Sequence, residues 1–264
     1  MATLGFIGMG NMGSAMLLGC QKEFPNSELL FTEINIEKMN SFSEKSGVGC
    51  VASGATLVES VKYIVLAVKP QFLQGVLDEI RPYVRAGQVV ISIVPARTIE
   101  YYERNLPEGV KIVRAMPNTP ALVGAGMTGV CYDDAEFSAE EKNVISKFFN
   151  SFGKMVKIDE KLMNALVCAS GSSPAYVYMF IEAMADSVVK YGIPRDMAYE
   201  LVAQTVLGSA KMVLETKEHP GKLKDNVCSP GGTTIAGVAA LEEYGFRNSI
   251  IKATDACFDK CQNL

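Results

Sequence analysis

The stretch Leu4-Gly5-Phe6-Ile7-Gly8-Met9-Gly10-Asn11-Met12-Gly13 decides how the rest of the chain is arranged. Its apolar start predicts a β-strand, its glycines are spaced G-x-G-x-x-G, and a helix is expected over Ser14–Gly19. In such a turn Gly8 permits the sharp exit from the strand, Gly10 lets backbone amides approach a pyrophosphate, and Gly13 lets the helix pack closely on the sheet. Because strand, turn and helix follow one another directly, we expect a dinucleotide site there rather than an ordinary connection.

The composition is typical of a globular chain of about two domains. The 264 residues are 48% hydrophobic, the net charge is -4, and lysine and arginine form no block, so nucleic acid and anionic membrane are not expected partners. No apolar run is long enough to span a membrane, since even Pro174–Ala185 is interrupted by Glu182. The first strand begins too close to Met1 for a cleavable leader, and we expect a cytoplasmic protein.

The cysteines do not form a metal-binding or disulfide pattern. There are seven, an odd number, and they are scattered without a C-x-x-C pair. Cys257 and Cys261 lie one helical turn apart with no histidine nearby, and the single His219 is expected in a loop beside Pro220-Gly221. We therefore predict no metal site and expect most cysteines to be small buried apolar residues.

The second strand, expected over Glu28–Thr32, ends in an acid. Glu33 stands about 20 residues after Gly13, where dinucleotide folds place a carboxylate on the adenosine ribose hydroxyls. A carboxylate there repels a 2′-phosphate, which favours NADH over NADPH. The alternative interpretation of Glu33 is a solvated loop glutamate.

Strands and helices alternate up to Ile158, as in an α/β fold with a mainly parallel sheet. The loop Ala115-Met116-Pro117-Asn118-Thr119-Pro120 follows a strand, at the edge where open α/β sheets bind ligands, and we predict that Asn118 contacts the cofactor. The expected elements are helices or helical turns at Lys38–Lys45, Leu57–Val61, Gln71–Val84 and Ala139–Phe149, and strands at Gly49–Val51, Tyr63–Val68, Val89–Ile93, Lys111–Arg114, Met127–Cys131 and Met155–Ile158.

From Glu160 onward every pattern is helical. Helices are expected at Glu160–Ala169, Pro174–Tyr191 and Pro194–Lys217, and a last one at Thr234–Cys261, bent or broken near Gly245. We therefore predict two domains, an N-terminal Rossmann-like sheet domain over residues 1–158 and an all-α domain over residues 159–264.

Two stretches interrupt the helical half. In Ser170-Gly171-Ser172-Ser173-Pro174, a helix N-cap at Ser173 and a first helical residue at Pro174 explain the break, although the hydroxyls could instead face a ligand. Asn226-Val227-Cys228-Ser229-Pro230-Gly231-Gly232-Thr233-Thr234 leads into a helix and offers more amides and hydroxyls than a plain loop and cap require. The second stretch is therefore a candidate carboxylate site.

Together these residues resemble the Δ1-pyrroline-5-carboxylate reductase family, whose members catalyse the last step of proline synthesis. The glycine turn is shared by many dinucleotide folds, whereas the last segment is specific to this family. The segments that carry the resemblance are Gly5–Met12, Ala67–Pro70, Val113–Pro120, Ser170–Tyr176 and, above all, His219–Gly221 with Asp225–Thr234.

The resemblance implies both ligands and an assembly. NADPH or NADH would bind the sheet domain, and the helical domain would be a dimerisation domain that interlocks with its neighbour, giving homodimers often assembled into decamers. The cofactor would contact Gly8, Gly10, Asn11, Met12, Gly13, Glu33, Asn35, Val68, Lys69 and Pro70, with Asn226 bordering the nicotinamide. The substrate, a cyclic imino acid, would lie on Ser229, Gly231, Gly232, Thr233 and Thr234, with Glu160 at the mouth of its site.

Two positions depart from the family's pattern. Glu33 stands where the family often has a small polar residue or an arginine, which leaves the cofactor preference open. Val94-Pro95-Ala96 replaces an Ala-Ala-Gly-like turn, so contacts at that turn are expected to differ.

Reduction of a cyclic imine requires positioning more than a strong base, because the imine nitrogen is basic enough to be protonated before hydride attack. We expect Thr234 to bond the ring nitrogen as the catalytic residue, the Gly231–Thr233 amides to hold the carboxylate, and Lys69 to be the other candidate acid. The alternatives are a 3-hydroxyacid dehydrogenase using Lys161 and Asn164, a non-catalytic dinucleotide sensor, and a related enzyme for a six-membered cyclic imine.

Overall fold

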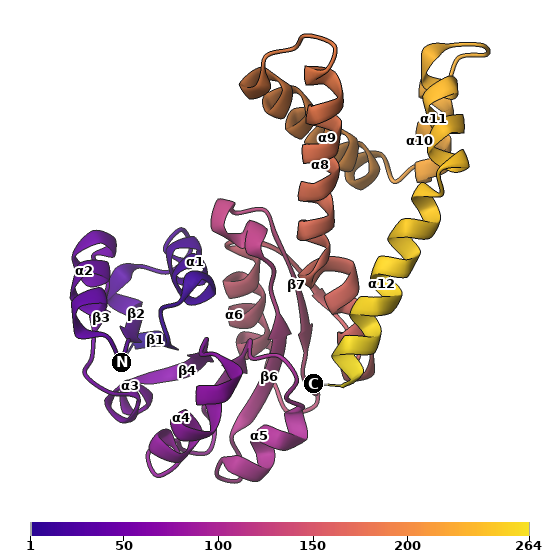
Figure 1. The fold of residues 1–264 in the computed structure, drawn as a ribbon. Coiled ribbons are helices and arrows are strands. Elements are labelled where there is room, and N and C mark those ends of the chain that lie inside the picture. The colour runs from indigo at the N-terminus through magenta and orange to yellow at the C-terminus, as the bar shows by residue number, and fades with distance from the viewer. Residues whose placement is uncertain (1, 264) are drawn as a thin grey trace. The chain divides into compact units, whose positions relative to one another are not determined.

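The computed structural model describes residues 2–263, so Met1 and Leu264, the outer ends of the two predicted domains, lie outside the described residues. The chain divides into two compact units (Figure 1). One, the sheet unit, comprises the residues up to Ser172 and those from Lys260 onward, and the other, the helical unit, is Ser173–Asp259. No helix within residues 2–263 combines the length and the apolar character needed to cross a membrane.

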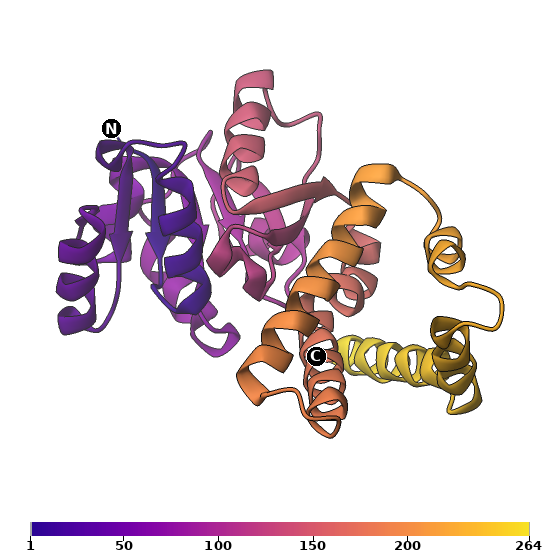
Figure 2. The ribbon, with the colours of Figure 1, turned by 90° about the horizontal axis from the view of Figure 1, so that it is seen from above.

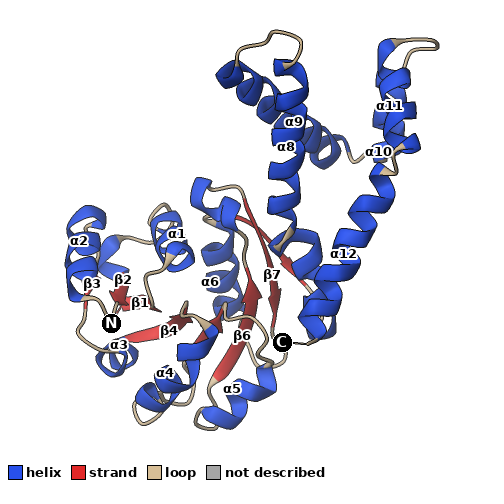
Figure 3. Cartoon of the chain, in the orientation of Figure 1, coloured by secondary structure: helices blue, strands red, loops and turns tan. Residues whose placement is uncertain are grey.

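The sheet unit is built on one sheet, whose strands are red in Figure 3. Its eight described strands lie in the order β3-β2-β1-β4-β5-β6-β7-β8. All neighbours pair in parallel except β6 and β7, which are antiparallel. The first six strands have the order of a doubly wound dinucleotide-binding sheet, so the predicted Rossmann-like class is confirmed. The strands are β1 Ala2–Ile7, β2 Leu29–Thr32, β3 Gly49–Cys50, β4 Val61–Leu66, β5 Val89–Ser92, β6 Lys111–Met116, β7 Gly126–Cys131 and β8 Gly153–Lys157.

Helices cover both faces of this sheet, which is why its central strands are continuously apolar. In β4 only Lys62 is exposed. This strand ends at Leu66, two residues before the predicted end, so Val68 lies in the connecting loop. The helices of the sheet unit are α1 Asn11–Cys20, α2 Ile36–Ser46, α3 Gly54–Ser60, α4 Leu73–Ile80, α5 Ile99–Asn105, α6 Ala139–Asn150 and α7 Met163–Leu166.

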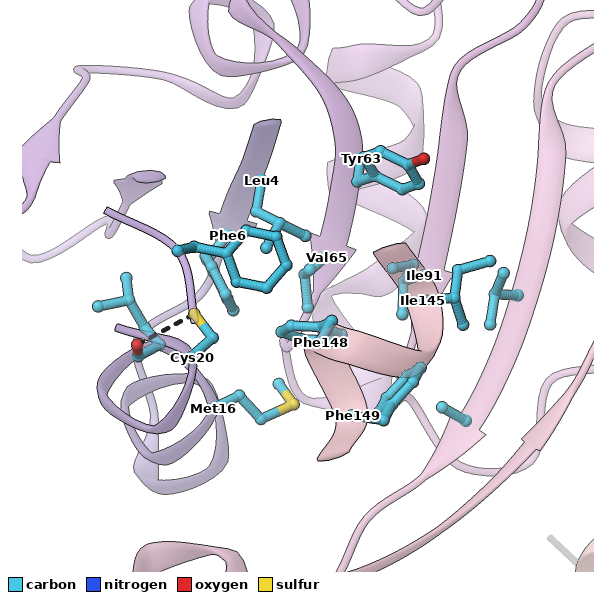
Figure 4. Packing of buried hydrophobic residues seen from close by; sticks show 14 of the residues in the cluster. Leu4, Phe6, Met16, Cys20, Tyr63, Val65, Ile91, Ile145, Phe148 and Phe149 are labelled. Carbon is cyan, nitrogen blue, oxygen red and sulfur yellow. Dashed lines mark hydrogen bonds between the residues drawn. The ribbon is translucent and has the colours of Figure 1, made fainter. Parts of the chain in front are cut away.

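The core has one apolar layer on each face of the sheet. On one face Phe6 and Val65 meet Met16 of α1 and Phe148 of α6 (Figure 4). Cys20 belongs to this layer, and burial raises the pKa of its thiol to about 12. On the other face Ile7, Ile64 and Leu66 pack with α3, α4 and α5 in a separate cluster. Alternate residues of β4 thus serve opposite layers, as the two-residue period of a strand requires.

Helix α5 is absent from the elements expected from the sequence. Its seven residues, Ile-Glu-Tyr-Tyr-Glu-Arg-Asn, contain few aliphatic side chains and show no clear apolar stripe. The helix is held by tertiary contacts, because Tyr102 is fully buried and its hydroxyl lies 2.5 Å from Ser92 Oγ. Thr98 caps its N-terminus by accepting a hydrogen bond from the Tyr101 N–H.

The helix break predicted at Ser170–Pro174 is absent, and the chain after Ile158 stays helical through this segment. A 3₁₀ turn at Glu160–Leu162, α7, and a π-helical turn at Val167–Gly171 lead into α8, which already includes Ser173. A π-helical turn therefore stands where the predicted break begins, and it connects the preceding helical turns to α8.

The structural division falls later than the predicted domain boundary at 158/159. Met163 and Leu166 pack with Cys131 of the sheet, so the first helical turns belong to the sheet unit. That residues 1–158 and 159–264 form two functional domains stays a prediction.

The helical unit contains α8 Ser173–Val189, α9 Arg195–Thr216, α10 Pro220–Val227, α11 Thr233–Glu243 and α12 Phe246–Gln262, whose last turn belongs to the sheet unit. Helices α8 and α9 lie side by side (Figure 2). They pack together through Ala185, Ala198 and Val202. Helix α10 is missing from the predicted elements, whereas the predicted break near Gly245 is confirmed, since that glycine has φ +74° between α11 and α12.

Candidate active site

The glycine turn joins β1 to α1 with the geometry of a phosphate cradle. Gly8 has φ +96°, and a methyl group on it would come within 2.8 Å of Ala67 O. A methyl group on Gly13 would lie 2.2 Å from Gly8 O, so only glycine allows α1 to start this close to the strand. At Gly10 the same group would project into open space. A side chain there would fill the space in front of the N-terminus of α1, which begins at Asn11 without a side-chain cap.

The ends of β1, β2 and β4 meet beside this turn. The Gly8 N–H donates to Thr32 O at 3.1 Å, and the Ala67 N–H donates to Ile7 O at 2.9 Å. Val68 packs directly on the turn, because its Cγ1 would lie 2.8 Å from a methyl group on Gly8. Lys69 follows, with an exposed side chain, and precedes the 3₁₀ turn Pro70–Phe72. The structure therefore brings these cofactor candidates to one edge of the sheet.

Glu33 is not a solvated loop glutamate. Its Oε2 accepts a hydrogen bond from the Met9 N–H at 3.0 Å and lies 3.5 Å from Lys38 Nζ, and its Oε1 accepts one from the Asn35 N–H at 3.2 Å. Only 11% of the side chain is exposed. Burial opposes ionisation, but the Asn35 and Met9 amides and the Lys38 charge hold the pKa of the carboxyl below its ordinary value. Glu33 therefore joins the end of β2 to the glycine turn as a carboxylate.

Asn35 and Asn118 both have structural partners. The Asn35 side chain caps α2 by accepting a hydrogen bond from the Lys38 N–H at 2.9 Å. Asn118 is buried, its Nδ2 donates to Ser170 O at 3.0 Å, and its Oδ1 accepts from the Met127 N–H at 2.8 Å. The Asn118 amide thus ties β7 to the π-helical turn, and its contact with a cofactor stays a prediction.

Glu160 connects two elements of the sheet unit, α5 and β6. Its Oε1 accepts hydrogen bonds from the Ile99 N–H at 2.8 Å and from Arg114 Nη1 at 2.9 Å. Arg114 is 8% exposed, so this carboxylate neutralises a nearly buried guanidinium and also caps α5. A cavity of about 880 Å³, lined by residues 131–134 and 157–162, includes Glu160. The sequence signal for this ion pair, which the predicted site did not include, is an arginine within the apolar stretch of β6.

The amide-rich loop of the helical unit connects α10 to α11. Asn226 lies on α10 rather than in the loop and is exposed. The Gly232 N–H donates to Ser229 O at 3.0 Å, and Gly231 has φ +69°, so these residues form a tight turn. Gly232 is the N-cap of α11 and provides no side-chain cap for the amides that follow.

The first-turn amides of α11 are suited to an anion. Thr233 and Thr234 occupy its first two positions, both with exposed side chains, and the first N–H groups of a helix have no intrahelical acceptor. The Gly232 amide is used by the turn itself, so the donors suited to an anion are Thr233 and Thr234.

The two sets of candidates lie in different units. The predicted cofactor residues, apart from Asn226, belong to the sheet unit, and the predicted substrate residues, apart from Glu160, belong to the helical unit. Within residues 2–263, no group of three or more histidine, cysteine or acidic side chains is placed to hold a metal ion.

Two segments of the chain match known protein families. Residues 160–264 match the family described as pyrroline-5-carboxylate reductase dimerisation, and residues 3–96 match the family described as NADP oxidoreductase, coenzyme F420-dependent. The match to a dimerisation family indicates that the chain forms oligomers.

Full-length relatives extend this similarity. The chain is 45% identical to pyrroline-5-carboxylate reductase of Escherichia coli over 99% of this chain and 97% of that protein. It is similar to the structure of the Coxiella burnetii enzyme, with a TM-score of 0.92, 31% identity, and coverage of 99% of this chain and 98% of that one. It is also similar to the Plasmodium falciparum enzyme with NADP bound, with a TM-score of 0.86, 34% identity, and coverage of 99% and 97%. The chain belongs to the pyrroline-5-carboxylate reductase family.

Proposed function

We propose that this chain reduces Δ1-pyrroline-5-carboxylate to L-proline by hydride transfer from NADPH or NADH, the last step of proline biosynthesis. The observation that carries the proposal is the extent of the similarity to the Escherichia coli reductase. It covers 99% of this chain, so it includes both the glycine turn and the Ser229–Thr234 loop.

The sheet unit fits a dinucleotide. Gly10 leaves open the space that a side chain would fill, and the uncapped N-terminus of α1, from Asn11 and Met12 to Gly13, presents amides to a pyrophosphate. In this proposal Glu33 binds the ribose and Lys69 contacts a phosphate. The other residues of this cofactor set are Asn35, Val68 and Pro70, with Asn118 and Asn226 as further candidates.

A bound reduced nicotinamide supplies the hydride, and the residues of the chain hold the acceptor in place. In this proposal the substrate carboxylate lies on the amides at the start of α11, beside the turn of Ser229, Gly231 and Gly232, where the positive end of the helix favours an anion. The Thr234 hydroxyl bonds the ring nitrogen, and Glu160 stands at the substrate mouth.

No strong base is required, because the imine nitrogen is protonated before attack. The single histidine is consistent with this chemistry. His219 Nδ1 accepts a hydrogen bond from the Gly221 N–H at 3.1 Å, and the residue caps α10. Catalysis then depends on aligning two reactants, which can supply a large part of a rate enhancement.

The direct test is a steady-state assay of the purified chain with Δ1-pyrroline-5-carboxylate and either NADH or NADPH. We expect loss of the reduced nicotinamide signal and an equal amount of proline. Oxidation of 3-hydroxyacids instead would favour the dehydrogenase alternative, in which the 78% exposed Lys161 would be catalytic. Turnover of a six-membered cyclic imine alone would change the substrate, and nucleotide binding without any turnover would favour a sensor.

A second experiment tests Thr234. Thr234→Ala should lower kcat on the order of 10²-fold and leave the affinity for nucleotide unchanged, because a bond to the reacting nitrogen is lost. Thr234→Ser should recover most of the activity. Thr233→Ala is the matched control, since only the backbone amide of Thr233 has a role here. Full activity of Thr234→Ala would remove Thr234 from the mechanism.

We also propose the assembly and the location. The chain forms a homodimer through the helical unit, supported by the many exposed apolar side chains on α8, α9, α11 and α12. A decamer is the larger assembly implied by the family resemblance, and light scattering after size-exclusion chromatography distinguishes the two. We place the enzyme in the cytoplasm, which fractionation of the source cells tests.

A further inference from the structure

The carboxylate of Glu33 is anchored on the glycine turn. The Met9 N–H that it accepts belongs to the G-x-G segment itself, at 3.0 Å, and the Asn35 N–H binds the other oxygen at 3.2 Å. With 11% of its side chain exposed, this carboxylate cannot turn aside without breaking both bonds. It therefore presents a fixed negative charge where the end of β2 meets the phosphate cradle.

Lys38 is the one cation among residues 33–38, all of which the structure describes. Its Nζ lies 3.5 Å from Glu33 Oε2, and its side chain is 48% exposed. The remaining residues of this stretch, whose last three residues begin α2, are two isoleucines, an asparagine and the exposed acid Glu37. The only positive charge among residues 33–38 is therefore already directed at Glu33.

The Glu33 carboxylate would attract a ribose hydroxyl and repel a ribose 2′-phosphate. Each carboxylate oxygen has two lone pairs, and Glu33 Oε1 accepts one recorded hydrogen bond, so it can also accept one from a hydroxyl. A 2′-phosphate is an anion that has no proton to donate when ionised, and it would face an immobile like charge. Selection against a ligand through such a repulsive contact is a common basis of specificity.

We propose that Glu33, anchored on the glycine turn, makes this chain select NAD(H) over NADP(H), and that Lys38 is a latent 2′-phosphate ligand which Glu33 keeps engaged. This inference rests on the proposed function in one respect, since it takes the glycine turn as the dinucleotide site. It distinguishes the chain from its Plasmodium falciparum relative, which was crystallised with NADP bound.

The test is direct binding of NAD⁺ and NADP⁺ by isothermal titration calorimetry, which does not depend on turnover. For the unmodified chain we expect NADP⁺ to bind at least about tenfold more weakly than NAD⁺. Glu33→Gln keeps an oxygen for the Met9 N–H, removes the charge and releases Lys38, so NADP⁺ should bind about tenfold more tightly than before. In the double variant Glu33→Gln/Lys38→Met this gain should disappear.

Glu37→Gln is the matched control, because it removes the same charge from the same stretch at an exposed position in the first turn of α2. We expect it to leave the ratio of the two dissociation constants within about twofold of the original, since an exposed charge is largely screened. A change as large as that of Glu33→Gln would mean that the overall charge of residues 33–38, and not the anchored contact, discriminates between the nucleotides, and would overturn the proposal.

Two further results would overturn it. One is equal or tighter binding of NADP⁺ by the unmodified chain, a result that needs no variant to fold. The other is an equal loss of both nucleotides in Glu33→Gln, which would give Glu33 only a structural role. If pyrroline-5-carboxylate is still reduced, these outcomes leave the proposed function standing. Failure of the folded chain to bind either nucleotide would instead remove the dinucleotide site, and both proposals with it.

Discussion

The two units of this molecule differ in how much of their apolar surface they bury. In the sheet unit Phe6, Phe31 and Phe148 are fully buried. In the helical unit α10, α11 and α12 bury no residue, and the 22 residues of α9 bury only Ala198 and Val202. Tyr244 is 83% exposed and Leu214 is 65% exposed.

This difference shows that the sheet unit has an extensive core of its own, whereas the core of the helical unit is limited to the small cluster between α8 and α9. In proteins most of the stability of a helix comes from packing its apolar face against other elements. The exposed apolar side chains of the helical unit therefore require a covering surface, which fits the match of residues 160–264 to a dimerisation family. The following experiments test this contrast.

The largest effect is expected from Phe148→Ala. Phe148 lies at the centre of an aromatic cluster, with ring centroids 5.9 Å from Phe6 and 4.8 Å from Phe149. Removing it from a close-packed core should lower the free energy of unfolding by about 3–5 kcal/mol, measured by urea denaturation. A loss below about 1 kcal/mol would show that the sheet unit is loosely packed and would weaken the contrast.

Glu141→Gln tests whether ion pairs differ in the same way, so that a buried pair of the sheet unit contributes more stability than an exposed pair of the helical unit. Glu141 is 5% exposed, with Lys62 Nζ at 3.0 Å and Lys111 Nζ at 2.7 Å. Burial opposes its ionisation, but hydrogen bonds from Lys111, the Ser138 N–H and Lys62 lower its pKa to about 2. At neutral pH the variant should lose about 2–3 kcal/mol of stability.

The pH dependence of this loss has a defined sign. Because the folded pKa of Glu141 lies below its ordinary value of 4.5, the stabilisation is complete above that pH and is lost as the pH falls towards 2. The two proteins should therefore converge in acid. Glu242→Gln, which removes the exposed ion pair with Arg247 in the helical unit, should change stability by less than about 0.5 kcal/mol. A pH-independent loss for Glu141→Gln would contradict the assignment.

Leu207→Ala tests whether the exposed face of α9 is covered in solution. Leu207 is 59% exposed, so in a lone chain the change should cost less than about 0.5 kcal/mol. If a second copy covers it, the cost should rise to about 1–2 kcal/mol, and the midpoint of thermal unfolding should depend on protein concentration. Lys211→Ala, at an exposed position of the same helix, is the control. A concentration-independent midpoint in both proteins would argue against a covered face at Leu207.

The smallest effect is expected at the two described residues other than glycine with positive φ. Ala96 of the sheet unit has φ +58°, and Lys217, the C-cap of α9, has φ +60°. Because glycine adopts this conformation without steric cost, Ala96→Gly and Lys217→Gly should each raise the free energy of unfolding by about 0.5–1 kcal/mol. Destabilisation by Ala96→Gly would show that this turn is not strained.

Helices α5 and α10 show where prediction from the sequence was insufficient. Helix α5 depends on Glu160, far along the chain, which accepts the N–H of its first residue. Helix α10 has eight residues and buries none, and its His-Pro-Gly start is typical of a loop, although proline at the first helical position also suits a helix. In both helices the local pattern is too weak to distinguish a short helix from a loop.

The glycine turn, the alternation of strands and helices and the break near Gly245 could all be inferred from residue order, because they follow from backbone sterics and short-range periodicity. The partners of Glu33, Asn118 and Glu160 could not. Each of these side chains is held by groups from elements distant in sequence, such as Met9, Ser170 and Arg114. Such contacts depend on how the sheet brings its strand ends together, and the side chains of a single segment do not encode that arrangement.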